Sequence, residues 1–436
     1  MAEQRTNKGA ADLWFSQSIF DTISAYPAHS MQNFDNNFVQ TRTEGQLVSE
    51  RFRSEMESIE RNHFAFFDSP FDFRITDPLL MGIKTTLIND HPCFATIQIS
   101  SQGIFVQKKS QNEKPDVFIG DLWSYLKIRP SFEAETENNE ITKSASVIAR
   151  LINSVSENAL VISVPDNIEI DNPIQIEVMS DFQDAIVPVH VIAYLGQSSK
   201  ANLSIDFISS DEDGNKNIIA VHTDYFVSEN AQLNIFRHQA LNGNTLVLLD
   251  DVVKQNRSSK ANYFNFDEGA KGLSSKLSLA LKGEGAEASI TGVFRPRETS
   301  RYYYDTEQIH AASYSESDLL YDGVIGEGAY ASWKGNIDVE KGTKGTNGYQ
   351  ANKNLIIHET GKVESVPGLE INTDDVRCSH GVTISNIDKN HMFYLQSRGI
   401  NEEEAEALII NGFIHSSINR IKTDVFTNQI SRLLGV

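Results

Sequence analysis

An internal repeat of short strand-like segments constrains the fold of this chain more than any other sequence feature. A small or polar residue, an alanine and an alternating stretch recur at Ala201, Ala231, Ala261, Ala286 and Ala329, at spacings of 30, 30, 25 and 43 residues. Gly361-Lys362-Val363 continues the series, with Lys362 in the position of the alanine. Periods of about 20–50 residues are typical of repeat architectures.

The strand segments of residues 147–387 follow one another without long helical stretches between them. A doubly wound parallel sheet needs such crossover helices, so that fold is excluded. The repeat instead favours a mainly β protein with a parallel β-helix at its core, because stacked coils let alternate side chains fill a continuous interior. A sandwich or a barrel is the alternative.

The chain divides into three parts. Residues 1–146 form an α+β region with expected helices over 12–23 and 46–63 and expected strands over 64–75 and 93–107. The β-helix core follows over 147–387, and 388–436 form a helical region. No function for the first part follows from its sequence.

Capping signals mark two helices in the region 388–436. Asp388 is placed to cap the first helix, and Gly399 is placed to end it. Asn401 and Glu404 have the spacing of a capping box at the start of the second. Apolar residues then follow at helical spacing: Ala405, Leu408, Ile409, Gly412 and Phe413, with Ile414, Ile418, Ile421 and Val425 beyond them. Two apolar stripes are more than one core contact needs, so one is predicted to meet a partner.

Charge and composition narrow the classes of function. The chain has 38 Lys and Arg against 59 Asp and Glu, a formal net charge of −21, which disfavours nucleic-acid binding. No apolar run approaches the roughly 20 residues of a membrane span. The N-terminal residues lack the apolar stretch of a secretory signal, so we expect a cytoplasmic protein. The two cysteines, Cys93 and Cys378, exclude a disulfide framework and a metal site built from this chain's thiols alone.

The segment Cys378-Ser379-His380 carries the main candidate chemistry. Residues i and i+2 of a strand point to the same face, so the thiol and the imidazole are placed to bind one metal ion, iron or zinc. Asp374 and Asp375 are the nearest further ligands. The structural alternative is a buried cysteine and a hydrogen-bonded histidine. Five more histidines occur singly in the strand region and are interpreted as structural: His190, His222, His238, His310 and His358.

The C-terminal third resembles a known protein family. Residues 367–413 are similar to the SufB/SufD family of iron–sulfur cluster assembly proteins, and within it to the SufD branch. The similarity is carried by D-D-V-x-C-S-H-G from Asp374 to Gly381 and by F-Y-L-x-S-R-G-I from Phe393 to Ile400. It extends over about residues 150–436, and the N-terminal third carries no motif of the family.

The resemblance implies a right-handed parallel β-helix that pairs, strand edge to strand edge, with a SufB-like subunit. It implies a C-terminal helical region that docks a SufC-like ABC ATPase, here through Phe393, Tyr394, Arg398, Gly399 and Ile400. His380 would be a ligand at the subunit interface for iron or a nascent cluster, with Cys378 as a weaker neighbour. The cluster or iron would be transient and shared with the partner. A homodimer is possible without that partner, and flavin binding stays open.

The predicted role is therefore a non-catalytic scaffold subunit. One alternative is a β-helix carbohydrate-active enzyme, a polysaccharide lyase or hydrolase, with Asp250-Asp251 or Asp374-Asp375 as acid and base. Adjacent strand residues face opposite sides, so neither pair is expected to converge. The other alternative is a SufB-like scaffold that accepts sulfur on Cys378.

Overall fold

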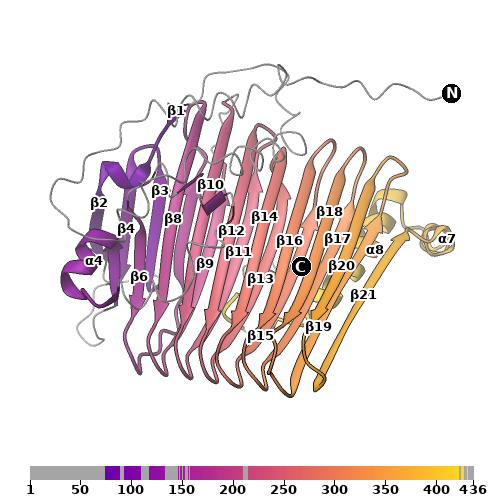
Figure 1. Ribbon diagram of the computed structural model, residues 1–436. Helices are drawn as coiled ribbons and strands as arrows, with labels where there is room; N and C mark the ends of the chain where they lie inside the picture. The colour runs from indigo at the N-terminus through magenta and orange to yellow at the C-terminus, as the bar shows by residue number, and fades with distance from the viewer. Residues whose placement is uncertain are drawn as a thin grey trace, which may run out of the picture.

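The computed structural model describes residues 74–88, 93–109, 117–132, 146, 148–149, 151–152, 156, 158–209, 215–421, 424–426 and 430. Of the described residues, 56% are in strands and 14% in helices, and the strands form a β-solenoid of about eight turns (Figure 1). The predicted β-helix is thus confirmed. No helix in these ranges is both long and apolar enough to span a membrane.

Two sheets form the walls of the solenoid. The ten strands of sheet A are β1 (Arg74–Ile75), β5 (Phe118–Asp121), β6 (Leu160–Val164), β8 (Ala185–Leu195), β10 (Asn217–Val227), β12 (Thr245–Gln255), β14 (Gly272–Leu281), β16 (Arg301–His310), β18 (Tyr330–Val339) and β20 (Lys362–Ile371). The eleven strands of sheet B are β2 (Ile83–Ile88), β3 (Ala95–Ser100), β4 (Gly103–Lys109), β7 (Ile174–Met179), β9 (Lys200–Ile208), β11 (Gln232–Leu241), β13 (Lys260–Gly269), β15 (Glu287–Arg295), β17 (Glu316–Ile325), β19 (Thr346–Ile356) and β21 (Val376–Asn386).

From β6 onward the chain alternates between the sheets, and each strand pairs in parallel with the strand two places later. One coil is therefore one strand of each sheet. The same register position is occupied in successive coils by Lys200, Gln232, Lys260, Glu287 and Glu316. At the N-terminal end β3 pairs antiparallel with β4, and β5 antiparallel with β6.

The corner before sheet B has a repeated local structure. A residue with a left-handed φ is followed by a small buried residue in six coils: Ser198-Ser199, Asn230-Ala231, Ser258-Ser259, Gly285-Ala286, Tyr314-Ser315 and Gly345-Thr346. The left-handed residue makes the tight turn, and the small residue lets adjacent coils stack closely. The small residue at this corner is serine or threonine in some coils and alanine in others.

Three details of the predicted repeat are wrong. Ala201 and Ala261 are in register with Leu233, two residues beyond the corner position of Ala231. Ala329 precedes β18 in sheet A and belongs to the opposite corner from Ala286, which explains the long interval between these two alanines. Lys362 is in register with Tyr330, so Gly361, not Lys362, takes the position of Ala329. The repeated unit is one whole coil, and it contains two corners.

The mainly apolar interior of the solenoid contains a fully buried charged cluster. Arg237 of β11 donates to Asp251 of β12 and to Asp267 of β13, each at 3.0 Å. The Tyr263 hydroxyl donates to Asp251 at 2.6 Å, and the Tyr304 hydroxyl to Asp267 at 3.1 Å. Burial opposes the charge of Arg237, but the neighbouring carboxylates hold its pKa above the ordinary value. These contacts tie together both walls of the solenoid.

Short helices accompany the two sheets. They are η3 (Pro78–Met81), α4 (Leu122–Ile128), α7 (Lys389–Ser397), α8 (Glu402–Ile418) and η4 (Asp424–Phe426). Helix α4 covers the outer face of sheet A, where Leu122 and Leu126 share a core with Ile192 and Phe226.

The predicted C-terminal helices are confirmed. The Asp388 carboxylate accepts from the amide of Asn390 at 2.8 Å, and Gly399 ends α7 at φ 90°. The Asn401 side chain accepts from the amide of Glu404 at 2.8 Å and so caps α8. The expected strands over 93–107 correspond to β3 and β4. The helices expected over 12–23 and 46–63, and most of the strand segment 64–75, lie outside the described residues.

Candidate functional site

The last coil, made of β20 and β21, is the open end of the solenoid (Figure 1). β20 pairs only with β18, and β21 only with β19, among the strands described. Each therefore has one edge of backbone N–H and C=O groups without a strand partner there. Such edges readily accept a further strand from another chain.

Core-type positions are exposed on this last coil. On β20, Leu369 and Ile371 are in register with Ile337 and Val339, which are fully buried, but they are 38% and 40% exposed themselves. On β21, Val382 is 40% exposed. A further coil would cover these side chains, as each coil covers the one before it. The Ile384 side chain, on the same side of β21, is 48% exposed.

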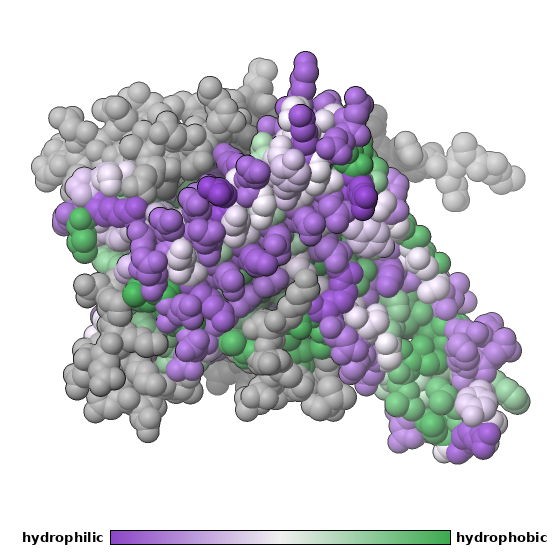
Figure 2. Space-filling model, turned by 90° about the horizontal axis from the view of Figure 1, so that it is seen from below, coloured by the Kyte–Doolittle hydropathy of each residue, from purple (hydrophilic) through white to green (hydrophobic). Residues whose placement is uncertain are grey.

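Hydrophobic surface gathers at this end of the molecule. Figure 2 shows hydrophobic residues gathered at its lower right, the end of the molecule that carries β21, α7 and α8 in Figure 1, while the middle of the visible face is mostly hydrophilic. Exposed apolar patches of this kind are typical of protein–protein contact sites. We call the inward-facing side chains of β20 and β21 the end face: Val363, Ser365, Pro367, Leu369, Ile371, Val376, Cys378, His380, Val382 and Ile384.

Cys378 and His380 both belong to the end face, as their i and i+2 spacing predicts. Cys378 is in register with Gly348, and His380 with Gln350. A Cβ atom at Gly348 would lie 3.3 Å from the Cys378 Sγ, so this glycine leaves the space that the thiol occupies. Cys378 is half-buried and His380 is exposed. Burial raises the pKa of the Cys378 thiol, so it is protonated at neutral pH in the isolated chain.

The end face does not contain a complete metal site of its own. Within the described ranges, the only group of three or more His, Cys, Asp and Glu side chains at metal-ligand distances is His190, His222 and Asp224, on other strands. Asp374 and Asp375 lie in an exposed turn before β21 and are not part of such a group. Any metal at Cys378 and His380 therefore needs further ligands from outside these residues.

Beneath the end face the interior becomes polar. Asn352 accepts at its Oδ1 from Asn354 at 2.6 Å and from the Ser365 hydroxyl at 2.5 Å. Gln350 donates to the carbonyl of Gly368 at 2.9 Å. This network links β19 to β20 and holds the last coil against the one before it.

His310 lies at the end of β16, close to the space beside Gly348 that Cys378 also borders. Its Nδ1 is 2.7 Å from the Ser315 hydroxyl and its Nε2 is 2.8 Å from the Ser317 hydroxyl. Burial lowers the pKa of His310 to about 4, so the ring is neutral in the folded protein.

The stability of the protein should therefore decrease on acidification. Between about pH 6.5 and 4 the unfolded chain protonates His310 and the folded chain does not, so the free energy of unfolding falls as pH falls, by up to about 3 kcal/mol. Urea unfolding at a series of pH values measures this. His310→Gln keeps a hydrogen-bonding side chain and should flatten that part of the curve. Equal pH slopes for the two proteins would contradict this assignment.

The remaining histidines lie apart from one another, except for the pair His190 and His222. His238 lies on sheet B, with its Nδ1 3.7 Å from Asp206, and His358 lies in a partly exposed turn. His190 and His222 are direct neighbours in register on sheet A. This pair was not predicted from the sequence, although both histidines follow a valine in strands that are one coil apart.

The acid pair Asp250-Asp251 does not converge, as strand geometry predicts. Asp250 contacts His222, and Asp251 contacts Arg237 in the solenoid interior. Both carboxylates are buried and ion-paired. This arrangement leaves no open cleft for a general acid and base acting on a polymer.

The helices α7 and α8 present a second surface. Phe393 and Tyr394 are 73% and 56% exposed, and the Arg398 guanidinium lies over the Tyr394 ring at 5.2 Å. Gly399 and Ile400 form the turn into α8. No residue of α7 is buried, so its apolar side chains are free to contact another protein.

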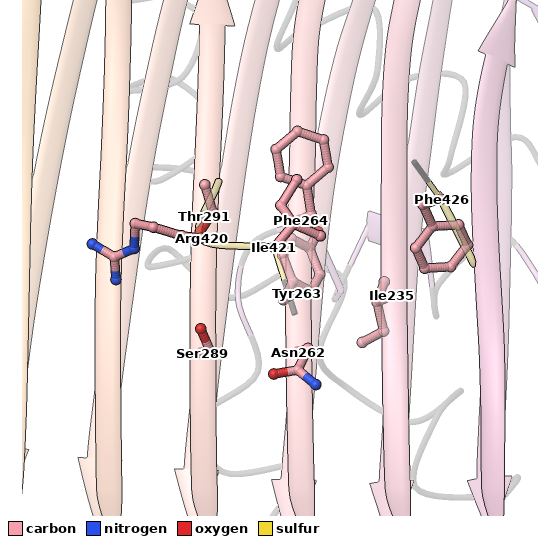
Figure 3. A pocket seen from close by; sticks show the side chains of 9 residues that line it. All are labelled: Ile235, Asn262, Tyr263, Phe264, Ser289, Thr291, Arg420, Ile421 and Phe426. Atoms are coloured by element: carbon pink, nitrogen blue, oxygen red, sulfur yellow. The ribbon is translucent and has the colours of Figure 1, made fainter. Parts of the chain in front are cut away.

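The other side of α8 belongs to the protein's own core. Ile410 and Ile414 pack with Phe236, Phe264 and other apolar side chains of sheet B. Figure 3 shows the tail residues Ile421 and Phe426 over the same face, beside a pocket also lined by Asn262, Ser289, Thr291 and Arg420. Phe426 stacks on Phe236 with ring centroids 5.4 Å apart. One of the two apolar stripes of this helix is therefore internal.

Comparison with known proteins gives consistent matches. Residues 178–413 match the family model for the SufBD core domain of SUF-system FeS cluster assembly. An iron–sulfur cluster assembly SufBD family protein of Synechocystis is 23% identical over 73% of this chain and 72% of its own length. The iron–sulfur cluster assembly proteins SufD of Escherichia coli and Bacillus subtilis are 29% and 24% identical. Those two matches cover 44% and 61% of this chain, and the same shares of the SufD proteins.

Proposed function

Because the chain belongs to the SufBD family of iron–sulfur cluster assembly proteins, we propose that it is a SufD-like, non-catalytic scaffold subunit of an assembly complex. It pairs through its end face with a SufB-like subunit and lends an interfacial ligand for iron or a nascent cluster. The observation that carries this proposal is the open last coil, where core-type side chains and two metal-ligating side chains share one exposed face.

The unpaired strand edges support the pairing. A partner strand placed against β21 would satisfy its backbone groups and bury Val382 and Ile384. A second copy of this chain offers the same edge, so a homodimer competes for the site when the partner is absent. Burial of the end face also raises the strength of any metal–ligand contact made there, because water is excluded.

The ligand role of His380 follows from its place on this face. Neutral imidazole binds iron, and the exposed ring of His380 is accessible to a metal ion held mainly by the partner. Cys378 is the weaker candidate because burial raises its pKa and so keeps its thiol protonated. The cluster or iron is a transient cargo, shared between the two subunits.

The SufC-like ATPase docks on α7. The exposed Phe393 and Tyr394, with Arg398 stacked on the tyrosine, form an aromatic and cationic surface of the kind enriched at protein interfaces. Gly399 and Ile400 set the angle between the two helices. Removing all of 388–436 would also strip Ile410 and Ile414 from the core of sheet B, so point variants on α7 test docking more cleanly than truncation.

A crossed experiment tests both roles in the reconstituted complex. His380→Ala should weaken iron retention by about tenfold or more, by comparison with the loss of other metal-supporting residues, and leave ATPase binding unchanged. The double variant Phe393→Ala, Tyr394→Ala should weaken ATPase binding and leave iron retention unchanged. Anaerobic co-purification followed by iron and acid-labile sulfide analysis gives the first readout, and pull-down of the ATPase gives the second.

His358→Ala is the matched control, since this histidine lies in a partly exposed turn next to β20 but outside the end face. It should change neither readout. Wild-type iron and sulfide content in the His380→Ala complex would contradict the ligand role. Persulfide labelling of Cys378 after treatment with a cysteine desulfurase would favour the SufB-like alternative.

A further inference from the structure

A cluster of buried charged side chains lies on sheet A, in coils far along the chain from the end face. His222 on β10 is in register with His190 on β8 and with Asp250 on β12. Asp224 follows His222 by two residues and points to the same side of the strand. Neighbouring coils thus bring these four side chains together.

Three atoms of the cluster are arranged around one point. The Asp224 Oδ2 is 3.0 Å from the His222 Nε2 and 3.3 Å from the His190 Nε2, and all three lie within 4.8 Å of one another. Ligands bonded to Zn²⁺ at about 2.0–2.1 Å in a tetrahedral site are about 3.3 Å apart. The oxygen–nitrogen distances already approach this spacing without any movement of the strands.

Two further side chains fix the orientation of these ligands. The His222 Nδ1 is 2.8 Å from the Asp250 carboxylate, so the Nε2 is the nitrogen that faces Asp224. A carboxylate on the far nitrogen of a histidine is the usual support of a metal ligand. Lys254 contacts the other oxygen of Asp224, Oδ1, at 3.3 Å. That contact neutralises charge and leaves Oδ2 to face the imidazoles.

A purely structural role for these residues is the competing explanation. Without a metal, His222 bridges Asp224 and Asp250 in an ion-pair network, and Asp224 and Asp250 raise the pKa of His222 to about 10 against the effect of burial. This network accounts for the burial of the charges. The network also includes the hydrogen-bond contact between the His190 Nε2 and the Asp224 Oδ2, so the two explanations differ in whether the cluster takes up a metal ion.

We propose that His190, His222 and Asp224 form a binding site for a divalent first-row transition metal ion. Two imidazoles and one carboxylate are a ligand set that suits Zn²⁺ and Fe²⁺. The site differs from the end face in strands, in ligands and in needing no partner subunit. It therefore goes beyond the proposed function and holds or fails independently of it.

The test uses the full chain in the Cys378→Ser, His380→Ala background, which removes the end-face ligands. After chelation and dialysis, titration with Co²⁺ is followed by visible absorption, and Zn²⁺ and anaerobic Fe²⁺ are titrated by calorimetry. One ion should bind per chain. His190→Gln and His222→Gln should each weaken binding at least tenfold, and Asp250→Asn by about 10–100-fold. His238→Gln, a partly buried histidine on sheet B, should leave binding unchanged.

X-ray absorption of the zinc-loaded protein tests the ligands directly, even where a variant fails to fold. The proposal expects two imidazoles and oxygen ligation with no sulfur. Absence of stoichiometric binding would overturn it in favour of the ion-pair network alone. Undiminished affinity in folded His190→Gln and His222→Gln proteins, or sulfur ligation, would also overturn it.

Discussion

Replacing Arg237 with leucine should destabilise the protein by about 3–5 kcal/mol. The substitution leaves Asp251 and Asp267 buried without their shared cation, and removing one partner of a buried ion pair costs far more than the pair itself contributes. Burial already raises the pKa of Asp251, and Arg237 opposes that rise. Without Arg237, the folded protein must either bury a carboxylate unpaired or take up a proton.

Chemical denaturation measures this effect, and two variants control for it. Lys260→Ala removes a cation from the adjoining strand β13, but its pair with Glu287 is about half-exposed, so a loss of less than about 1 kcal/mol is expected. The triple change of Arg237→Leu with Asp251→Asn and Asp267→Asn should recover much of the stability. If Arg237→Leu costs no more than Lys260→Ala, the buried network does not support the solenoid.

Lysines on the end face should strongly weaken pairing with the SufB-like subunit. Val382→Lys with Ile384→Lys places two charges where the partner would have to bury them unpaired, which costs several kcal/mol. The dissociation constant should rise by about 100-fold or more, equivalent to about 2.7 kcal/mol. Because both side chains are already 40% and 48% exposed, the free chain should lose about 1 kcal/mol or less.

Thr383→Lys is the matched control for these variants. Thr383 lies between the two residues on β21, on the opposite side of the strand, and is exposed. It should leave pairing nearly unchanged, as measured by size-exclusion chromatography with light scattering or by calorimetry. Equal weakening by Thr383→Lys would show that added charge alone, and not the end face, determines the loss.

Much of this architecture could be predicted from local patterns. Alternation of side chains placed Cys378 and His380 on one face and Asp250 and Asp251 on opposite faces, because a strand has a period of two. The N-caps Asp388 and Asn401 predicted where the two C-terminal helices begin, since capping depends on residues close in sequence. The all-strand repeat predicted the solenoid.

The parts that were not predicted depend on register between coils. Serine, threonine and alanine are interchangeable at the corner before sheet B, so the alanines alone could not show that Ala329 belongs to the other corner. The neighbourhood of His190 and His222 follows only once the length of the coil between them is known. The exposure of the apolar residues of the end face was not predicted, because in sequence they look like ordinary core. They are exposed because the described strands include no further coil to cover them.

Amide hydrogen exchange of β20 and β21, with and without the SufB-like partner, tests the central claim most directly. The exposed-edge amides of residues 362–386 should become protected on complex formation, while β9 and β11, in the middle of the solenoid, should not change. Exchange at residues 362–386 that is the same with and without a bound partner would contradict the account.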